Sequence, residues 1–546
     1  MKFQNIYFSS RRIITLQLLL LTLAVGLLYG NFLSSPLVFD DRSFVQRSLP
    51  EIQKIFFSLD SRWLPYSSFN WTRNLPGESL VWWRLGNLAL HIANTFLLFL
   101  LLRRLFAAVL PEEYAHSNSA LPLPWLAFFG ALIFALHPVA VYGVAYLVQR
   151  SILMATMFAL LTWLFFCEGL LRNRQRWLLA SAATYLLAVL SKEHAIMTPA
   201  VCAALLLLLH KPDKQLWARV GPTFLLYGLA AAFLIYQFKS KNVLGYAYEP
   251  DGVKLLSRGG VYSIDQAIAH PLSILTQSYL YFKYFWLWLV PNPAWMSVDM
   301  LENFATRFWT WPETAGLAGF IVYPLVAAYL LLKRGSIGLL GFALLCPWLL
   351  FATELSTVRI QEVFVLYRSY LWMPCLFAAL PFLLQKLSAK YSVAILFAVV
   401  LAITPVTWNR LTVFSDPVLL WDDAMRVAKK TSYFGTWRIY HSRGMAYLDQ
   451  ELYPQAIQDL SEGIRLLPND SRSYTVRGVA YLKTENYTQA LIDFNMAIQL
   501  DSGYWNPYLG RAQVYEALGN PVAAMRDYAQ SCQLGVSEVC AKAQFE

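Results

Sequence analysis

The stretch SRSYTVRGVAYLKTENYTQALIDFNMAIQLDSGY, residues 471–504, is one copy of a pattern that recurs every 34 residues near the C-terminus. Small residues, tyrosines and large apolar side chains keep the same register in all three copies. They are Gly444, Gly478 and Ala512; Tyr447, Tyr481 and Tyr515; Ala456, Ala490 and Ala524; Tyr440, Tyr474 and Tyr508; and Leu460, Phe494 and Tyr528. This spacing predicts pairs of helices that touch at the small residues and stack into a solenoid.

A 34-residue period with this residue pattern is typical of tetratricopeptide (TPR) repeats, which we predict at about 437–470, 471–504 and 505–538. Three repeats are about the minimum for a stable array, and such arrays bind protein segments on their concave face. Arg443, Arg477 and Arg511 also recur, each one residue before the small position. They form either a structural face of the array or a basic ridge that binds a partner.

Before residue 410 the sequence has a different character. The whole chain is 57% hydrophobic and 14% charged, and apolar blocks of about 20 residues, such as Ile13–Leu33, recur along this part. Blocks of that length match a bilayer crossing. We therefore predict an all-α chain: a multispanning transmembrane helical bundle over 1–410, a linker over 411–436, and an α-solenoid TPR domain over 437–546.

Basic residues at the ends of the apolar blocks predict the topology, because cytoplasmic loops are enriched in Lys and Arg. About 11 crossings follow, with the N-terminus inside, the tail outside, and outer loops at about 34–80 and 239–272. The segment 274–290 either crosses the membrane or is re-entrant or interfacial. Only the second alternative keeps all of the later basic ends inside. The later ends are Lys333/Arg334 and Lys386/Lys390; the earlier basic ends, inside on either alternative, are Arg11/Arg12, Arg103/Arg104, Arg172/Arg174/Arg176 and Lys211/Lys214.

The first apolar block lacks a small-residue cleavage site, which predicts an uncleaved membrane anchor. We expect a bacterial inner membrane with a periplasmic TPR tail; an endoplasmic reticulum membrane is the topologically equivalent alternative. The net charge of +11 is distributed over these inner ends, so membrane lipids are expected partners and nucleic acid is not. A transporter is disfavoured because the ionisable residues gather at outer ends rather than at mid-membrane.

Six cysteines do not make a disulfide framework. Cys167, Cys202, Cys346 and Cys375 lie in or beside apolar spans and are expected to be inert. Cys532 and Cys540 are in the last repeat and the segment after it, where a disulfide suits an outer compartment. A metal site at this pair is less favoured, because no further Cys or His accompanies it.

Ionisable residues at the outer ends of membrane spans are costly and indicate function. The adjacent carboxylates Asp40 and Asp41 follow the first span and suit a general base or a divalent cation. Cations that suit a lipid-linked phosphate lie at other outer ends. The complete outer set also includes His137, Arg150, Lys192, Glu193, His194, Arg359, Glu362 and Arg368. Each of these alone is a solvated or headgroup-anchoring residue; together they favour an active site.

Most of these residues occur in motifs whose order resembles TMTC-type membrane proteins and their bacterial TPR-containing relatives, within the GT-C glycosyltransferase class. The resemblance runs through nearly the whole chain, although the array is shorter than in many eukaryotic members. The motifs are Phe39-Asp40-Asp41, Ala135-Leu136-His137-Pro138, Gln149-Arg150, Leu190-Ser191-Lys192-Glu193, Ser297-Val298-Asp299, Ile360-Gln361-Glu362-Val363 and Tyr367-Arg368-Ser369-Tyr370-Leu371.

The resemblance implies an O-mannosyltransferase-like enzyme that moves a sugar from a polyprenyl-phosphate donor to an acceptor hydroxyl, with a protein acceptor or partner bound by the TPRs. It places Asp40 or Asp41 as the base or metal-linked acid, and Arg150, Lys192 and Arg368 at the donor phosphate. His137, Glu193, His194, Arg359 and Glu362 would line the site. The alternatives are an oligosaccharide ligase that acts on lipid or surface glycan, and a non-catalytic TPR docking protein.

Overall fold

The computed structural model describes residues 2–45, 57–72, 79–110, 121–247, 264–428 and 435–543, with residues 49, 52, 55 and 75 between them. Much of the predicted outer loop 239–272 and part of the linker fall outside this described set. The described residues are mostly helical and contain no strand, apart from an isolated bridge between Met300 and Phe364. The prediction of an all-helical chain is confirmed. The chain forms two compact units, Met1–Ser415 and Asp416–Glu546.

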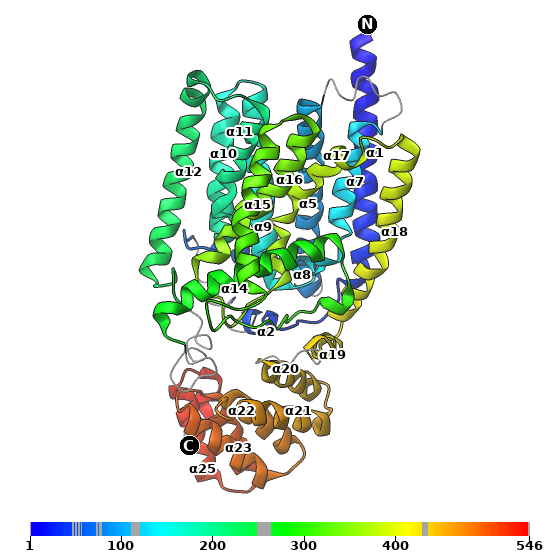
Figure 1. The fold of residues 1–546 in the computed structure, drawn as a ribbon. Helices are drawn as coiled ribbons and strands as arrows, with labels where there is room; N and C mark the ends of the chain where they lie inside the picture. The colour runs from blue at the N-terminus through cyan, green and yellow to red at the C-terminus, as the bar shows by residue number, and fades with distance from the viewer. Residues whose placement is uncertain are drawn as a thin grey trace. The chain divides into compact units, whose positions relative to one another are not determined.

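The first unit is a bundle of long apolar helices joined by short 3₁₀ turns (Figure 1). In chain order these are α1 (Lys2–Tyr29), α2 (Asp41–Ser43), α4 (Trp63–Ser67), α5 (Ser79–Val109), α7 (Leu123–Ala135), η4 (Pro138–Ala140), α8 (Val141–Val144), η5 (Leu147–Gln149), α9 (Arg150–Leu171), α10 (Gln175–Ser191), η6 (Glu193–Met197), α11 (Thr198–Leu209), α12 (Lys214–Ser240), α14 (Gln266–Leu289), α15 (Glu313–Leu332), α16 (Gly335–Phe351), η8 (Ala352–Ser356), η9 (Leu366–Tyr370), η10 (Met373–Ala379), α17 (Leu380–Leu384) and α18 (Ala389–Phe414).

Several of these helices are long and apolar enough to cross a membrane. Within the described residues there are seven, or eight if the bent pair of α7 and Pro138–Val144 is one span. A helix suits this role because it satisfies its backbone hydrogen bonds internally. The central span Leu147–Leu171 is 67% buried by protein, whereas Glu313–Leu332 is only 17% buried. Exposed apolar faces of this size on the outer helices fit contact with lipid. The count of about 11 crossings stays a prediction.

The turns that carry the basic residues lie at one end of the bundle. Arg104 forms a 2.7 Å salt bridge with Glu168, which joins the ends of α5 and α9. Arg219 at the start of α12 donates to Asn173 between α9 and α10. At the start of α16, Ser336 donates to Gln385 over 2.9 Å. The short helices α2 and α8 lie at the opposite end, away from the N-terminus (Figure 1).

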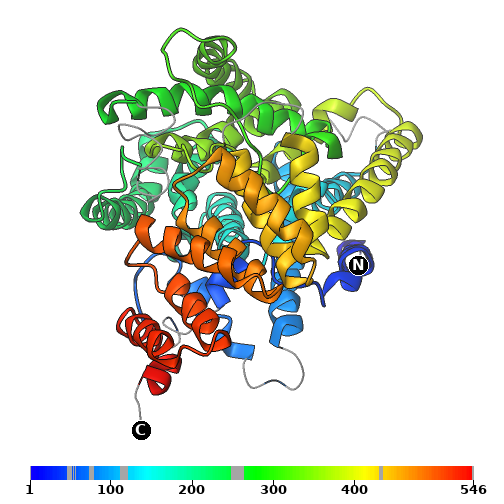
Figure 2. The same cartoon turned by 90° about the horizontal axis from the view of Figure 1, so that it is seen from below.

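Helix α14 does not run with the spanning helices. It lies across the bundle at the end that carries α2 and α8, as both views show (Figures 1 and 2). One face of α14 packs inward and donates two hydrogen bonds to the segment before η9: Gln277 donates to the Val363 carbonyl over 2.7 Å, and Tyr284 to the Val365 carbonyl over 2.9 Å. This arrangement fits the interfacial alternative for residues 274–290.

The second unit consists of paired antiparallel helices followed by a short 3₁₀ segment. The helices are α19 (Pro417–Ala428), α20 (Thr436–Asp449), α21 (Tyr453–Leu466), α22 (Ser471–Lys483), α23 (Tyr487–Leu500), α24 (Asn506–Ala517), α25 (Pro521–Gln533) and η11 (Ser537–Ala543). A Cβ atom on Gly478 would lie 2.8 Å from the Phe494 ring, so the small residue permits the close approach of α22 and α23.

The segment predicted as a linker over 411–436 is mostly structured. Helix α18 continues to Phe414, and α19 belongs to the second unit. Leu420 and Ala424 of α19 are buried, and its Asp422 accepts a 2.9 Å hydrogen bond from Arg443. Helix α19 thus packs before the first repeat as the second helix of a preceding half-repeat would, and it covers the end of the array.

A close approach of two candidate spanning helices generates a prediction about packing. A Cβ on Gly341 of α16 would lie 2.1 Å from the backbone nitrogen of Leu331 on α15, so Gly341→Val forces the helices apart. Overpacking of this kind costs about 3 kcal/mol. We expect a lower melting temperature for the detergent-purified variant. The matched control is Gly228→Val on α12, where a Cβ meets nothing within 4 Å. Equal melting temperatures for the two variants would contradict this packing.

Candidate functional site

Asp41 is fully buried at the start of α2, and its carboxylate accepts hydrogen bonds from backbone N–H groups. Oδ1 accepts a 2.8 Å hydrogen bond from the Val148 N–H, and Oδ2 accepts one of 3.2 Å from Leu147. Burial raises the pKa of Asp41 to about 7, although Arg84 and the backbone N–H groups act to lower it. Asp41 therefore anchors the first outer loop to the beginning of α9, which does not suit the general base that the sequence led us to expect.

Asp40 has the opposite environment. It is exposed, and its Oδ2 accepts a 2.8 Å hydrogen bond from the Tyr146 hydroxyl. Burial first, and then the nearby carboxylates, raise the pKa of Tyr146 well above its ordinary value, so it remains a neutral donor. Phe39, directly before Asp40, has a φ of +50°, a strained conformation for a bulky residue that is enriched at functional sites. The predicted acidic pair is thus divided into a structural and an accessible carboxylate.

Arg150 has a structural role, because its guanidinium connects several segments of the bundle. Its guanidinium donates to the Asn87 side chain (2.9 Å), the Ser68 hydroxyl (3.0 Å) and the Trp83 carbonyl (2.6 Å). It also stacks over Phe69, 3.6 Å from the ring centroid. These contacts join α9, α5 and the segment after α4. Because its N–H groups are directed to protein acceptors, the geometry does not favour the phosphate-binding role predicted for Arg150.

Lys192 lies just after α10, almost completely buried beside aromatic and amide groups. Its Nζ donates to Gln149 Oε1 over 2.9 Å and lies 4.8 Å from the Tyr367 ring centroid. Burial, together with the charges of Arg62 and Arg368, lowers the pKa of Lys192 to about 7, while Glu193 and Glu362 oppose this shift. An ammonium has three N–H donors and Gln149 accepts one of them, so Lys192 is suited to bind an anion.

Glu354, which the sequence analysis did not identify, is the centre of the charged cluster. It is fully buried at the end of the α16 span. Its Oε2 lies 3.0 Å from Arg368 Nη1 and 3.2 Å from Arg359 Nε, and its Oε1 lies 2.8 Å from His194 Nε2. One carboxylate therefore positions three of the residues predicted for the site.

Two further carboxylates flank this centre. Glu362 accepts 3.0 Å hydrogen bonds from Arg368 Nη2 and from the Tyr367 hydroxyl. Glu193 pairs with Arg62, an ion pair that was not predicted, through a 3.1 Å bond from Nε. Burial opposes the ionised form of Glu193, but Arg62 and His194 outweigh burial and hold its pKa well below the usual range. Both carboxylates compensate the positive charge of the cluster.

His137 has a local structural role. Its Nδ1 accepts from the Val139 N–H at 3.3 Å and caps η4, while Nε2 lies 3.1 Å from the Trp288 carbonyl. The imidazole is stacked on the Trp288 ring at 4.4 Å. The structure therefore brings together Lys192, Glu193, His194, Arg359, Glu362 and Arg368, with Asp40 connected through Tyr146, and leaves His137, Asp41 and Arg150 as supports.

A cavity of about 280 Å³ adjoins the cluster, between the end of α12, η6 and η8. Glu193, His194 and Arg359 form a polar side, and the buried Thr357 hydroxyl has no hydrogen-bond partner among the described residues. The remaining walls are mostly apolar. They include Ile196, Met197, Leu234, Ile235, Phe238, Val243, Leu244 and Ala352. The cavity can accept the chain of an amphiphile whose polar end lies at the charged cluster.

A divalent cation at the acidic pair was left open by the sequence, and the geometry does not fit one. Asp41 directs its oxygens to backbone N–H groups, and Asp40 accepts from Tyr146. In the described ranges, no three His, Cys, Asp or Glu side chains are grouped as metal ligands. No chemical step is therefore assigned to a metal.

The arginines that recur in the repeats form ion pairs between neighbouring helices of the array. Arg443, Arg477 and Arg511 each make a two-pronged ion pair with the aspartate 16 residues later, namely Asp459, Asp493 and Asp527, with Nε–Oδ2 distances of 2.6, 2.8 and 2.7 Å. Each also donates through Nη1 to the preceding helix, at Asp422, Ser461 and Asn495. These guanidinium groups hold neighbouring helices together, which favours the structural face over a basic partner-binding ridge.

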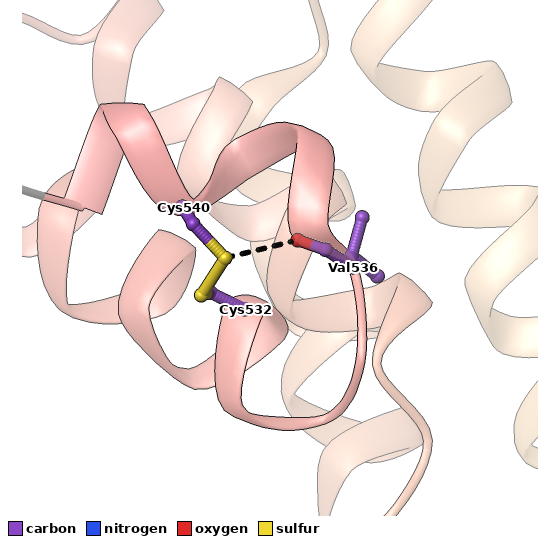
Figure 3. The surroundings of a disulfide bond; sticks show 3 residues. All are labelled: Cys532, Val536 and Cys540. Carbon is purple, nitrogen blue, oxygen red and sulfur yellow. Dashed lines mark hydrogen bonds between the residues drawn. A yellow bond between two sulfur atoms is a disulfide. The ribbon is translucent and has the colours of Figure 1, made fainter.

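A disulfide joins Cys532 of α25 to Cys540 of η11 (Figure 3). The two Cα atoms are 5.1 Å apart, and Cys540 Sγ is also 3.5 Å from the Val536 carbonyl oxygen. The bond fastens η11 to the last repeat, where Val539 packs against Ala512, Ala524 and Tyr528. It closes the C-terminal end of the array, as α19 closes the other end.

We expect Arg477→Ala to lower the free energy of unfolding of the tail, residues 416–546, by about 2 kcal/mol in urea titrations. Fully buried pairs lose roughly 3–5 kcal/mol when one partner is removed, and Arg477 is one-fifth exposed. The control is Arg465→Ala, which removes an exposed Arg–Glu pair and should leave stability unchanged. Equal stability of both variants would restore the binding-ridge alternative.

Comparisons with known proteins identify the repeats. A sequence model described as tetratricopeptide repeat matches residues 471–504. A search of curated proteins found no match. Similar solved structures include the first TPR of Spaghetti (RPAP3) bound to an HSP90 peptide, at 25% identity over 20% of this chain and 86% of that chain (TM-score 0.19). Others are MamA AMB-1 (17% identity; 29% and 87%; TM-score 0.19) and yeast Tom70 (9%; 77% and 83%; TM-score 0.22). These scores are too low to support an argument. The repeat match and the periodic helix pairs show a TPR-containing protein.

Proposed function

We propose that this protein is a membrane glycosyltransferase that moves a sugar from a polyprenyl-phosphate donor to an acceptor hydroxyl. One observation carries the proposal: an exposed carboxylate and buried cations belong to one contact network beside an apolar cavity. Asp40 accepts from Tyr146, whose ring lies 6.2 Å from that of Tyr367. Tyr367 in turn lies under Lys192 and donates to Glu362.

The proposed reaction needs a base, a stabilised leaving group and a site with little water. Asp40 takes the proton of the acceptor hydroxyl while the oxygen of that hydroxyl forms a bond to C1 of the sugar. The bond between C1 and the phosphate oxygen breaks, and the electron pair leaves with the polyprenyl phosphate. Lys192 would stabilise that negative charge, beside Arg368 and Arg359, whose own charges are compensated by Glu354 and Glu362. The donor's lipid chain would occupy the cavity beside α12.

The TPR tail would recruit the acceptor protein or a partner on the same side of the membrane as the site. Helix α18 ends at the site's end of the bundle, where Thr407 donates to the Leu136 carbonyl (2.5 Å) and Arg410 to that of Met296 (2.9 Å). The chain therefore leaves the membrane domain on that side. The Cys532–Cys540 disulfide suits an oxidising compartment such as a bacterial periplasm or the endoplasmic reticulum lumen.

Two alternatives use part of the same description. An oligosaccharide ligase that acts on lipid or surface glycan would require the same leaving group and a different acceptor. A non-catalytic docking protein is favoured by the TPR match itself, since such arrays bind protein segments. That alternative gives no role to an exposed carboxylate at the membrane end.

We expect Asp40→Asn to lower glycan transfer about 10²- to 10⁴-fold, the usual contribution of a general base, without reducing the amount of protein in the membrane. The measurement is the glycan-dependent mass shift of surface material in a deletion strain that expresses each variant in place of the wild-type protein. Asp60→Asn, a change to an exposed loop-1 carboxylate, should behave as wild type. Asp41→Asn should instead reduce membrane levels, because it removes the backbone anchor. Full transfer by Asp40→Asn would refute the catalytic assignment.

Donor affinity should depend on pH through Lys192. Its pKa is lowered to about 7, so the side chain is a cation below that pH and neutral above it. The affinity for polyprenyl phosphate mannose, a phosphodiester whose charge is constant over this range, should therefore fall as the pH rises from 6 to 8. Lys192→Arg keeps its charge and should flatten this dependence. Titrations of nanodisc-embedded protein would test this; identical pH profiles for the two proteins would exclude Lys192 from the phosphate site.

A further inference from the structure

The segment before α15 exposes an unusual group of aromatic side chains. Trp309 is 87% exposed and Trp311 is 85% exposed, with Phe308 about half exposed beside them. Tryptophan is usually well covered in a folded protein, because its large apolar surface is costly to leave in water. Two almost bare indoles within three residues therefore indicate a surface that the protein itself does not cover.

The position of these residues relative to a membrane span is fixed. Helix α15 begins at Glu313 and is one of the candidate spans. The Thr310 N–H donates to Thr314 Oγ1 over 3.1 Å, and the Thr314 hydroxyl donates back to the Thr310 carbonyl over 2.8 Å. These bonds fasten the aromatic segment to the first turn of α15. Trp309 and Trp311 therefore lie within about one helical turn of the end of a span.

Helix α14 continues the same kind of surface. Its Trp286 and Leu289 are exposed, as is Trp295 after its end, although its other face is buried. The Ala305 N–H donates to Thr276 of α14 over 3.0 Å, and Lys283 pairs with Glu302. These contacts hold the segment that leads to Phe308 along α14. Helix α14 lies across one end of the bundle along its whole length (Figures 1 and 2).

We infer that Trp286, Trp295, Phe308, Trp309 and Trp311, here called the aromatic rim, insert into the headgroup region of the bilayer leaflet on the site's side. Tryptophan is enriched at this level because the ring is amphipathic, and helices that lie in the interface bury an apolar face there. The rim leads along the chain into α15, whose exposed apolar face includes Ile321 and Leu325. That face contacts lipid when α15 crosses the membrane. The inference does not depend on the proposed transfer reaction.

A spin label at Arg307→Cys, an exposed position beside the rim, tests the inference in the full chain. The four free cysteines are buried, so the introduced thiol is the accessible one among the described residues. The protein is placed in nanodiscs of phosphatidylcholine and phosphatidylglycerol, and collisions of the label with oxygen and with a water-soluble nickel complex are measured. Labels at Leu325→Cys, on the exposed face of α15, and at Thr488→Cys, on the surface of α23, give the lipid and water limits.

We expect nickel collisions at position 307 to be several-fold below the Thr488 value, and to rise toward it when Trp309→Ser and Trp311→Ser are introduced together. Both proteins must show the same thermal unfolding, so that a folding defect is excluded. A label at 307 that is as accessible to nickel as Thr488 with both indoles present would overturn the inference. So would shielding that survives the double substitution, or that appears only at protein concentrations where two copies associate.

Discussion

A charge buried at the end of an apolar helix must be compensated, and the candidate site of this protein is organised by that constraint at Glu354. Its carboxylate is completely buried, and it lies within 3.2 Å of cationic or imidazole nitrogens from η6, η9 and the loop after η8. These groups come from segments far apart in the sequence. Neutralising Glu354 alone would leave two arginines buried without their common partner, so this end of the bundle and the positions of its cations depend on one carboxylate.

The same rule explains which predicted residues remain available for chemistry. Arg150 and Asp41 are surrounded by backbone and side-chain partners and are committed to structure, whereas Asp40 is exposed and Lys192 has few protein acceptors. Adjacent aspartates cannot be distinguished in sequence, because a one-residue difference decides whether the carboxylate points into the loop anchor or away from it. The backbone strain at Phe39 accompanies this change of direction.

Sequence periodicity and composition predicted the helical class and the repeats, because both depend on local patterns. The sequence also carries a signal that favours the structural face over the basic ridge. Asp459, Asp493 and Asp527 share the 34-residue period of the arginines with which they pair. Glu354 also left a signal, since it is a lone acidic residue in the apolar segment Gly335–Ser356. Its partners follow from tertiary packing, which no local pattern encodes. The hydropathy of α14 alone likewise could not show that it lies across the bundle.

The central claim is that the cavity beside Glu193, His194 and Arg359 holds the chain of a lipid whose phosphate faces the cations. Photo-crosslinking tests it most directly, with a polyprenyl phosphate mannose that carries a diazirine near the head of its chain. The account predicts crosslinks concentrated in the peptides that contain residues 234–244 and 352–359, suppressed by excess unlabelled donor and unaffected by excess phosphatidylglycerol. Crosslinks spread over the lipid-facing sides of α1, α15 and α18, with no competition by the donor, would contradict it.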